Sequence, residues 1–396
     1  MLTYRALFAL PAFRALWTGS ALTTVASTTS SLALATLVHR QTGSALLTAV
    51  AMSGPSIAQA LGAVTLMSAA DASPPRRTLV LVGAVSTAAL ALQVLPGLGP
   101  APRLLLVVGT AYVVAVGSGV RWGLLSELVP PGAYPLARST VNAANGAFQV
   151  AGFAAGGLLL TVLTTTQVFA LAAAVSAVAV GVLRFGLAER PPRRSGRAGV
   201  AETLRGNRLL LSRRETRTLL VALCVPNGLV VGCEALFVPY AGERGGWLLA
   251  AGAVGMLTGD LVVGRFLTPA QRRRSNTVLR LLLAAPLVLF ALGPSVPVAA
   301  VLVALASAGY AAGLAQQEWL VALTPAGLRG QVLGFESAAR MTGQGVFAVL
   351  AGALGDALTP GGAVTVLATG SLAVSLVLAP GLRRAAHRAD DPARTT

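Results

Sequence analysis

The sequence is short of the residues on which soluble enzymes and nucleic-acid-binding proteins depend. Only 11% of its 396 residues are charged, it has two histidines and two cysteines, and it contains no lysine. An average soluble domain carries about 25% charged residues. The sequence also has no Walker A segment, no GxSxG motif and no metal-ligand cluster, so it offers no site for ATP hydrolysis, serine-hydrolase or metal chemistry. We therefore expect neither an enzyme nor a bound cofactor.

The two cysteines do not suit a disulfide or a metal site. Cys224 and Cys233 lie nine residues apart in one predicted helix. At about 100° per residue they point to opposite faces of that helix, whereas a disulfide needs its Cα atoms within about 7 Å. We expect both thiols to stay free.

Long apolar runs take the place of the missing charge. Hydrophobic residues make up 55% of the chain, and a helix of about 20 apolar residues spans the hydrocarbon core of a bilayer, about 30 Å. Twelve such runs are present, at 13–38, 46–70, 78–97, 103–128, 138–163, 167–188, 217–241, 246–267, 276–294, 297–323, 329–356 and 361–380. The sequence therefore predicts an all-α integral membrane protein with twelve transmembrane helices.

Arginines divide this pattern in the middle, since residues 189–217 contain nine of them. We predict an N-terminal six-helix half at 1–188, a basic cytoplasmic linker at 189–216, a C-terminal six-helix half at 217–380 and a cytoplasmic tail at 381–396. The other arginines gather in loops on the linker's side of the membrane, as the positive-inside rule requires of cytoplasmic loops. The net charge of +17 is therefore assigned to membrane topology and not to nucleic acid. We expect a multi-pass protein of the inner (cell) membrane with both termini in the cytoplasm.

A faint internal repeat follows the same division. Four matches recur at an offset of 195 residues: Pro130 with Pro325, Gly132 with Gly327, Gln149 with Gln344, and Gly157 with Gly352. They fall in corresponding parts of the two halves, so we expect pseudo-symmetric halves with a substrate site between them. In the linker, Val200, Leu204 and Leu211 recur at spacings of four and seven. This fits either a short amphipathic helix on the inner membrane surface or a solvated connection.

Four stretches of the chain carry motif-like patterns. They are AADASPPRRTLVL (69–81), GSGVRWGLLSELVPPG (117–132), GFAAGG (152–157) and TPAGLRGQVLGFESAARMTGQGVFAVLAGALGD (324–356). In order, they are similar to the cytoplasmic motif A, the segment leading into the fifth helix, the efflux motif C and the eleventh helix of the major facilitator superfamily. The chain resembles in particular the twelve-helix, proton-coupled efflux members of this family.

The resemblance implies a gate at the cytoplasmic side. Asp71 would be the acid of motif A and would lie against the N-terminus of the eleventh helix, where the helix dipole favours an anion. Arg76 and Arg77 would be the basic pair of the same motif. The chain departs from many antiporters of the family because it has no arginine near residues 110–112 and no acid in its first helix. The resemblance therefore does not supply the usual proton-relay residues.

Hydroxyl and amide side chains form polar stripes on several predicted helices. In the first helix six hydroxyls recur at helical spacing, which favours a face that lines water or substrate, with helix packing as the alternative. The stripes of the fifth, seventh and tenth helices contain mainly amides. We assign all of them to the substrate cavity: Ser20, Thr23, Thr24, Ser27, Thr28, Ser31, Asn142, Asn145, Gln149, Asn227, Tyr310 and Gln317.

Ionisable residues inside a membrane are candidates for function. Glu234 lies about 10 Å from the outer end of the seventh helix, at 1.5 Å per residue, and is the candidate carrier of a proton or other cation. A structural hydrogen bond and a place in the outer membrane interface are the alternatives. Glu336 and Arg340 are four residues apart and suit a same-face pair. We assign this pair and the remaining charges to gates: Arg121, Glu127, Asp260, Arg265, Glu318, Glu336 and Arg340.

Together these features predict a secondary active transporter that exports small hydrophobic or amphipathic compounds in exchange for protons, by alternating access. One alternative is an uptake symporter for a polar metabolite; an aromatic content of 5% weakens it, since a buried polar substrate needs paired groups. A non-transporting membrane protein that binds a ligand is a third possibility. The expected partners are a small-molecule substrate, a proton or other cation, and bilayer lipid. The chain is expected to be a monomer.

Overall fold

The computed structural model describes residues 3–42, 45–130, 132–196, 198–241 and 244–389, and the regular elements in these ranges are all helical. The first half contains α1 (Tyr4–Ala9), α2 (Pro11–Thr42), α3 (Ala45–Thr65), α4 (Ala69–Ala72), α5 (Pro75–Leu92), α6 (Pro100–Leu128), α7 (Tyr134–Val162) and α8 (Thr165–Gly186). The linker contains α9 (Val200–Ser212). The second half contains α10 (Arg214–Glu234), α11 (Phe237–Ala241), α12 (Gly245–Arg265), α13 (Pro269–Leu282), α14 (Ala285–Val288), η2 (Leu289–Leu292), α15 (Val296–Ala308), η3 (Gly309–Ala311), α16 (Ala312–Leu323), η4 (Ala326–Leu328), α17 (Arg329–Ala357) and α18 (Pro360–Ala389).

The helices fall where the apolar runs predicted them. In the described residues, ten helical segments are long and apolar enough to span a membrane. With α3 and α17 they make the twelve predicted spans, so the all-α membrane fold is confirmed. Residues 200–212 of the linker form α9, and a helix there is one of the two alternatives that the spacing of Val200, Leu204 and Leu211 left open. One end differs from the prediction, because α18 runs on to Ala389, through the first part of the predicted tail; the rest of that tail, 390–396, lies outside the described residues.

Local sequence sets several helix ends. Thr164 before α8 and Thr268 before α13 each accept a hydrogen bond from the backbone N–H of the glutamine three residues on, whose side chain bonds back to the cap. Such capping boxes satisfy donors that a helix N-terminus leaves unpaired. Gly132, between α6 and α7, has φ +81°, a backbone conformation that glycine adopts without steric cost.

Three predicted spans are broken rather than continuous. The seventh passes from α10 into α11, the ninth consists of α13, α14 and η2, and the tenth is interrupted by η3 before α16. At η3, a Cβ atom on Gly309 would collide with the backbone of Leu283. Glycine at this position therefore lets the end of α13 lie directly against the break.

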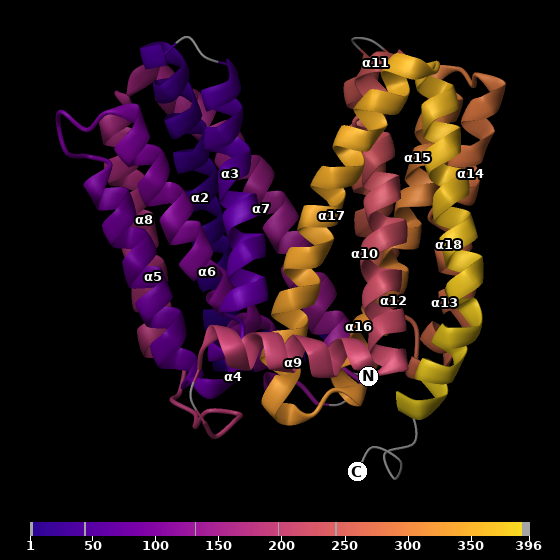
Figure 1. Cartoon of the computed structure of the whole chain (residues 1–396), viewed down its shortest axis with the longest axis horizontal. Helices are drawn as coiled ribbons and strands as arrows, with labels where there is room; N and C mark the ends of the chain where they lie inside the picture. The colour runs from indigo at the N-terminus through magenta and orange to yellow at the C-terminus, as the bar shows by residue number, and fades with distance from the viewer. Residues whose placement is uncertain (1–2, 43–44, 131, 197, 242–243, 390–396) are drawn as a thin grey trace.

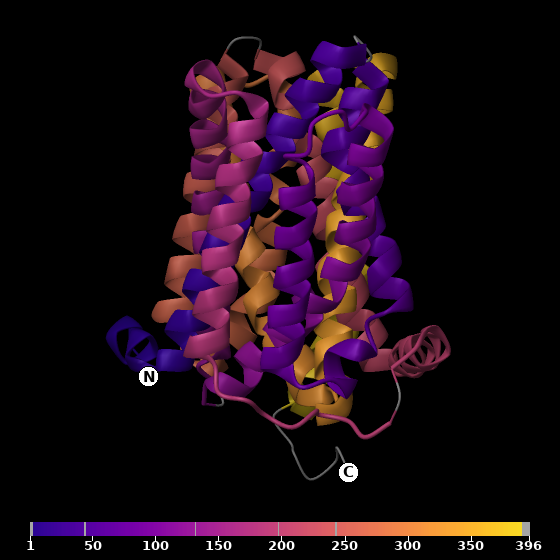
Figure 2. The ribbon, with the colours of Figure 1, turned by 90° about the vertical axis from the view of Figure 1, so that its left-hand side faces the viewer.

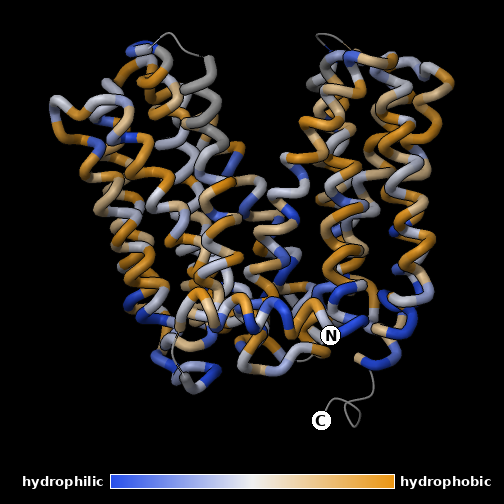
Figure 3. Tube along the Cα trace, viewed as in Figure 1, coloured by the Kyte–Doolittle hydropathy of each residue, from blue (hydrophilic) through white to orange (hydrophobic). Residues whose placement is uncertain are grey.

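The spans form two bundles, α2–α8 and α10–α18, which lie close together at one end and diverge towards the other (Figure 1). We call the close end the basic end; α4, α9 and the end of α18 lie there. Figure 2 shows α1 and α9 lying across the direction of the bundles, on opposite sides of this end. Hydrophilic residues gather at the basic end, and apolar residues dominate the rest of both bundles (Figure 3).

The core and the exposure of the facing helices follow this arrangement. One hydrophobic cluster joins residues of both halves, including Met67, Val120 and Leu125 from the first and Leu219 and Leu333 from the second. Three further clusters each belong to one half. On α7, residues 134–139 are all buried, and on α17, residues 330–334; none of residues 341–350 of α17 is buried. The halves therefore pack together at the basic end and separate beyond it.

Candidate transport site and gate

Asp71 joins the first half to the backbone of the second at the basic end. The short helix α4 places its almost completely buried side chain at the first turn of α17. The carboxylate accepts hydrogen bonds from the backbone N–H groups of Gly330, at 2.8 Å, and Gln331, at 2.7 Å. A carboxylate at a helix N-terminus satisfies unpaired donors and is attracted by the helix dipole. This contact is the one that the resemblance implied for Asp71.

A linker arginine completes this contact. Arg193 Nη1 lies 3.4 Å from Asp71 Oδ1, and Arg193 Nε pairs with Glu127 at the end of α6. Burial raises the pKa of Asp71 above its ordinary value, whereas the hydrogen bonds from α17 and the charge of Arg193 act in the opposite direction. The sequence did not point to Arg193, because the whole arginine-rich linker suggested topology and no particular contact.

The basic pair assigned to motif A lies elsewhere. Arg76 forms an ion pair with Glu189 at 3.1 Å, just after α8, and Arg77 is exposed. Both arginines lie in the first turn of α5, and neither is bonded to Asp71 in the described part of the chain. The contacts of Arg76, with Glu189 and the carbonyl of Leu187, remain within the first half and its connection to the linker.

Glycines allow α6 and α17 to approach closely above Asp71. A Cβ atom on Gly119 of α6 would lie 2.7 Å from the carbonyl oxygen of Gly330, and one on Gly334 would lie 2.9 Å from the Cα of Gly119. Met67 fills the space beside both glycines. The closed arrangement of the basic end therefore has no room for a larger residue at Gly119 or Gly334.

A second inter-half contact consists of charged groups. Arg138 of α7 and Glu336 of α17 are both 0% exposed, and their side chains lie 3.5 Å apart. The guanidinium also stacks on the ring of Trp122, 3.5 Å from its centroid, and donates to the hydroxyl of Tyr134 at 3.1 Å. Arg340 Nε donates to the other carboxylate oxygen of Glu336 at 2.9 Å, the same-face pair that the spacing predicted. Glu336 thus holds one arginine from each half.

Asp260 and Gln317 surround this pair. Asp260 of α12 is buried and lies within electrostatic range of Arg138 and Arg340, although it forms no ion pair within 4.0 Å among the described residues. Gln317 Nε2 lies 3.4 Å from Glu336. We call Arg138, Asp260, Glu336 and Arg340 the buried charge cluster. The cluster thus gathers two basic and two acidic side chains at one buried place, where charged groups are ordinarily paired.

Arg138 is the residue of this cluster that sequence reasoning missed. The fifth apolar run begins at residue 138, which predicts that Arg138 lies at the membrane surface. The helix begins at Tyr134, about one turn earlier at 3.6 residues per turn. That extra turn brings Arg138 inside, and the signal that could have found it is the helix-spaced pair Tyr134 and Arg138.

The remaining candidate gate charges divide into paired and unpaired groups. Glu318 pairs with Arg272 at 3.3 Å, and Arg272 also donates to the carbonyl of Gly132 in the first half, at 3.0 Å. Arg265 lies over the ring of Phe266 and does not pair with Asp260. Arg121 is half-buried and forms no ion pair within the described part of the chain.

Further polar pairs lie on the second half, nearer the diverging end. The hydroxyl of Tyr310, in the break η3, lies 3.3 Å from Glu234 Oε1 near the end of α10. Gln344 of α17 donates to Asn227 Oδ1 at 2.8 Å. The structure thus brings together Glu234 with Tyr310, and Asn227 with Gln344, whose role the sequence had noted only as part of the repeat.

The hydroxyl stripe of the first predicted span divides in the structure. Ser20 and Thr28 are buried, and Thr28 packs against Gly152 of α7. Thr23, Thr24 and Ser31 are half-buried and Ser27 is exposed. The hydroxyls of Ser20, Thr23, Ser27 and Thr28 donate to carbonyl groups of their own helix. Helix packing therefore accounts for part of the stripe, and the partly exposed hydroxyls remain as candidate lining.

The stripe on α7 also divides. Asn142 and Asn145 are half-buried, and Gln149 is exposed. The side-chain oxygen of Asn145 is buried without a hydrogen-bond partner among the described residues. Gly152 and Gly156 of the motif C-like segment pack closely on α2, so they serve helix contact and not a lining.

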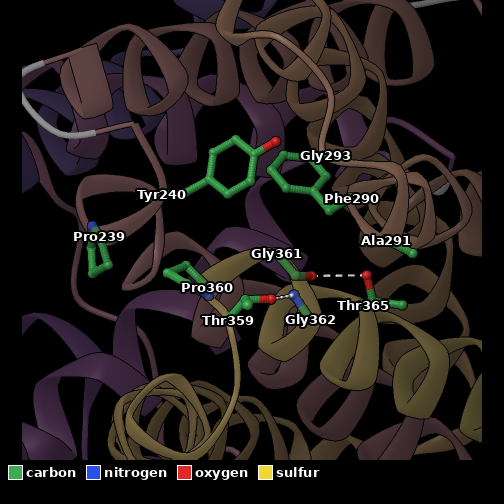
Figure 4. Close-up of a pocket in the computed structure, with 10 residues that line it drawn as sticks. All are labelled: Pro239, Tyr240, Phe290, Ala291, Gly293, Thr359, Pro360, Gly361, Gly362 and Thr365. Atoms are coloured by element: carbon green, nitrogen blue, oxygen red, sulfur yellow. Dashed lines mark hydrogen bonds between the residues drawn. The ribbon is translucent and has the colours of Figure 1, made fainter.

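A separate cavity of about 520 Å³ lies at the diverging end of the second half. Its walls include Tyr240, Phe290 and the first turn of α18 around Thr359 and Gly361 (Figure 4). The hydroxyl of Tyr240 is already bonded to the carbonyl of Pro294 at 2.6 Å. This cavity lies inside one half, away from the buried charge cluster. The described residues contain no group of side chains that could hold a metal ion, and both cysteines are free.

The two helical bundles, joined at the basic end, define a multi-pass membrane protein built from two halves. The sequence matches the Major Facilitator Superfamily over residues 16–335, and the chain belongs to this family. No curated protein matches the sequence closely.

Solved structures share the fold at low sequence identity. A bacterial homologue of the iron transporter ferroportin, in its outward-facing state, has a TM-score of 0.71 at 16% identity, over 95% of this chain and 99% of that chain. The human organic anion transporter MFSD10 has 0.72 at 18% identity, over 93% and 99%. The E. coli fucose:proton symporter has 0.68 at 13% identity, over 93% and 97%. These likenesses support the fold and do not define a substrate.

Proposed function

We propose that the protein is a secondary active transporter that exports small hydrophobic or amphipathic compounds in exchange for protons. The observation that carries this proposal is the buried pair Arg138–Glu336, which joins the two halves at one end while they diverge at the other. A balanced, buried ion pair between two bodies can form and break as a unit, as alternating access requires.

The basic end faces the cytoplasm in this proposal. The linker and α13 supply many arginines there, and the positive-inside rule places such segments on the cytoplasmic side. The chain then lies in the cell membrane with both termini inside, and its structure is an outward-open state. Transport would rock residues 1–188 against 217–380 and break the contacts of Asp71, Arg138 and Arg272 in the inward-open state.

Glu234 is the proposed proton carrier. Its carboxyl lies in the diverging part of the second half, bonded to Tyr310, and an ionisable group at such a position titrates between states of different exposure. The partly exposed Thr23, Thr24 and Ser27 supply hydroxyls for a substrate. Export of apolar compounds is favoured because α7 and α17 expose apolar side chains towards the diverging end, among them Val150 and Val346.

An uptake symporter for a polar metabolite is the second candidate function. The observation in its favour is the set of hydroxyl and amide groups on α2, α7 and α10, among which the buried side-chain oxygen of Asn145 has no partner in the described ranges. The fucose and xylose symporters that share the fold are proton-coupled by their descriptions. We also propose that the chain acts as a monomer, without a cofactor and without enzymatic activity.

The direct test is transport in an efflux-deficient host. Cells expressing the protein are loaded with a panel of apolar dyes, with and without a protonophore, and dye accumulation is measured. Lower accumulation that the protonophore abolishes supports export. Glu234→Gln should remove the dependence of dye accumulation on pH. Asp356→Asn, which changes an exposed acid of α17, should retain this dependence. Raised accumulation of a polar solute instead would favour the symporter, and unchanged pH dependence in Glu234→Gln would exclude that residue.

A further inference from the structure

The linker helix α9 is bonded to both halves at the basic end. The Thr203 hydroxyl accepts from the backbone N–H of Ser68 at 3.0 Å, and the Thr203 carbonyl accepts from Gln331 of α17 at 2.8 Å. Asn207 repeats this pattern. Its Nδ2 donates to the carbonyl of Val64 at 3.2 Å, and its Oδ1 accepts from Gln331 at 2.8 Å. Since the Gln331 backbone is also bonded to Asp71, α9 stabilises the closed arrangement of this end.

The other faces of α9 have a definite order. The buried face consists of Thr203, Gly206, Asn207 and Leu210. At about 100° per residue, Val200, Leu204 and Leu211 lie within about 40° of one another and next to this face, and all three are exposed. Arg208 and Arg205 follow further round the helix, and 75% of the Arg205 side chain is exposed. An apolar stripe therefore separates the buried face from the arginines.

The position of α9 matches this pattern. It lies across the direction of the membrane-spanning helices, at the side of the basic end and not beneath it (Figure 2). A helix in this position with an apolar stripe and neighbouring arginines suits the boundary between acyl chains and headgroups. The linker region 189–217 has nine arginines and three glutamates, so it attracts anionic headgroups.

We propose that α9 binds anionic phospholipid headgroups of the leaflet at the basic end, and that this binding stabilises the closed basic end. Val200, Leu204 and Leu211 enter the apolar boundary, and Arg205 and Arg208 contact the phosphates. The Arg205–Glu202 pair within the helix does not prevent this, because an exposed ion pair of this kind contributes little. The lipid acts on the gate through the bonds of Thr203 and Asn207 to Gln331.

Hydrogen exchange in lipid nanodiscs tests the proposal. The full chain is placed in discs of phosphatidylcholine, or in discs in which part of this lipid is replaced by phosphatidylglycerol. Amide exchange is followed in residues 200–212 and 329–336. An arginine at an anionic surface gains about fivefold in affinity, so two give up to roughly 30-fold slower exchange in the anionic discs. The effect should shrink as salt is raised.

The matched variants carry the same change of charge. In Arg205→Gln/Arg208→Gln, the amides of residues 200–212 and 329–336 should exchange at the neutral-disc rate in both lipids. Arg383 and Arg384 are exposed near the end of α18, and Arg383→Gln/Arg384→Gln should respond to anionic lipid like the unmodified chain. The proposal would be overturned if anionic discs slowed exchange in the α9 variant as much as in the unmodified chain, or if they slowed it in neither. It would also be overturned if soluble glycerol phosphate slowed exchange equally in neutral discs. These readouts need no transport, so they stand apart from the proposed export function.

Discussion

The guanidinium of Arg138 lies 3.5 Å from the carboxylate of Glu336, and both side chains, which belong to different halves of the molecule, are completely buried. Arg340 occupies the second oxygen of the same carboxylate. Glu336 therefore has one partner that moves with its own half and one that must be released when the halves separate. This difference underlies the first prediction.

Removing one member of the pair should destabilise the closed basic end more than removing both. Arg138→Gln leaves the charge cluster with an excess negative charge, and breaking a buried pair from one side costs about 3–5 kcal/mol. In Arg138→Gln/Glu336→Gln the charges are removed together and two amides can bond, so part of the loss should be recovered. Thermal unfolding midpoints of both variants and of Glu336→Gln give the comparison. Additive losses in the double variant would contradict the pairing.

A methyl group on Gly119 should prevent closure of the basic end. Its Cβ atom would lie 2.5 Å from Met67 Sδ and 2.7 Å from the carbonyl oxygen of Gly330, and the backbone of α17 cannot move aside as a flexible side chain can. Gly109→Ala is the control on the same helix, because its Cβ atom would meet no atom within 4 Å. Distances between spin labels at the basic end of each half should lengthen in Gly119→Ala and not in Gly109→Ala. Unchanged distances in Gly119→Ala would show that the helices do not close as described.

Asp71→Asn should weaken the gate even though it keeps the shape of the side chain. The amide can accept from only one of the N–H groups of Gly330 and Gln331, and its own NH₂ would face the other. An unpaired buried donor costs about 1–3 kcal/mol. We expect a cysteine introduced at the basic end to react faster with a thiol label in Asp71→Asn. Arg77→Gln, which removes an exposed charge nearby, should leave the labelling rate unchanged. Equal reactivity in the two variants would contradict the role of Asp71.

The sequence predicted the helices well because membrane-spanning helices are specified by long apolar runs, a local property. It also predicted the Glu336–Arg340 pair, since both residues lie on one helix. Arg138 and Arg193 were not predicted as contacts of Glu336 and Asp71, because those pairs depend on how distant segments meet. The first turn of α7, from Tyr134, also lies outside the apolar run. The predicted helix therefore started at Arg138, and its side chain was expected at the membrane surface and not in the protein interior.

The polar stripes show a second limit. Ser20 and Thr28 have the same helical spacing as Ser27, but neighbouring helices cover the first two and not the third. Periodicity gives a face of a helix and does not give the partner of that face. For the same reason, the exposed stripe of α9 was visible in sequence, while its bonds to Gln331 were not.

Proton movement in proteoliposomes tests proton-coupled export most directly. The purified protein is reconstituted around a trapped pH-sensitive dye, and the apolar compound whose accumulation in cells falls most is added outside. Exchange for protons predicts that the lumen becomes more alkaline as the compound enters, and that Glu234→Gln abolishes this change while Asp356→Asn does not. A lumen that becomes more acidic, or compound entry with no proton movement, would contradict proton-coupled export.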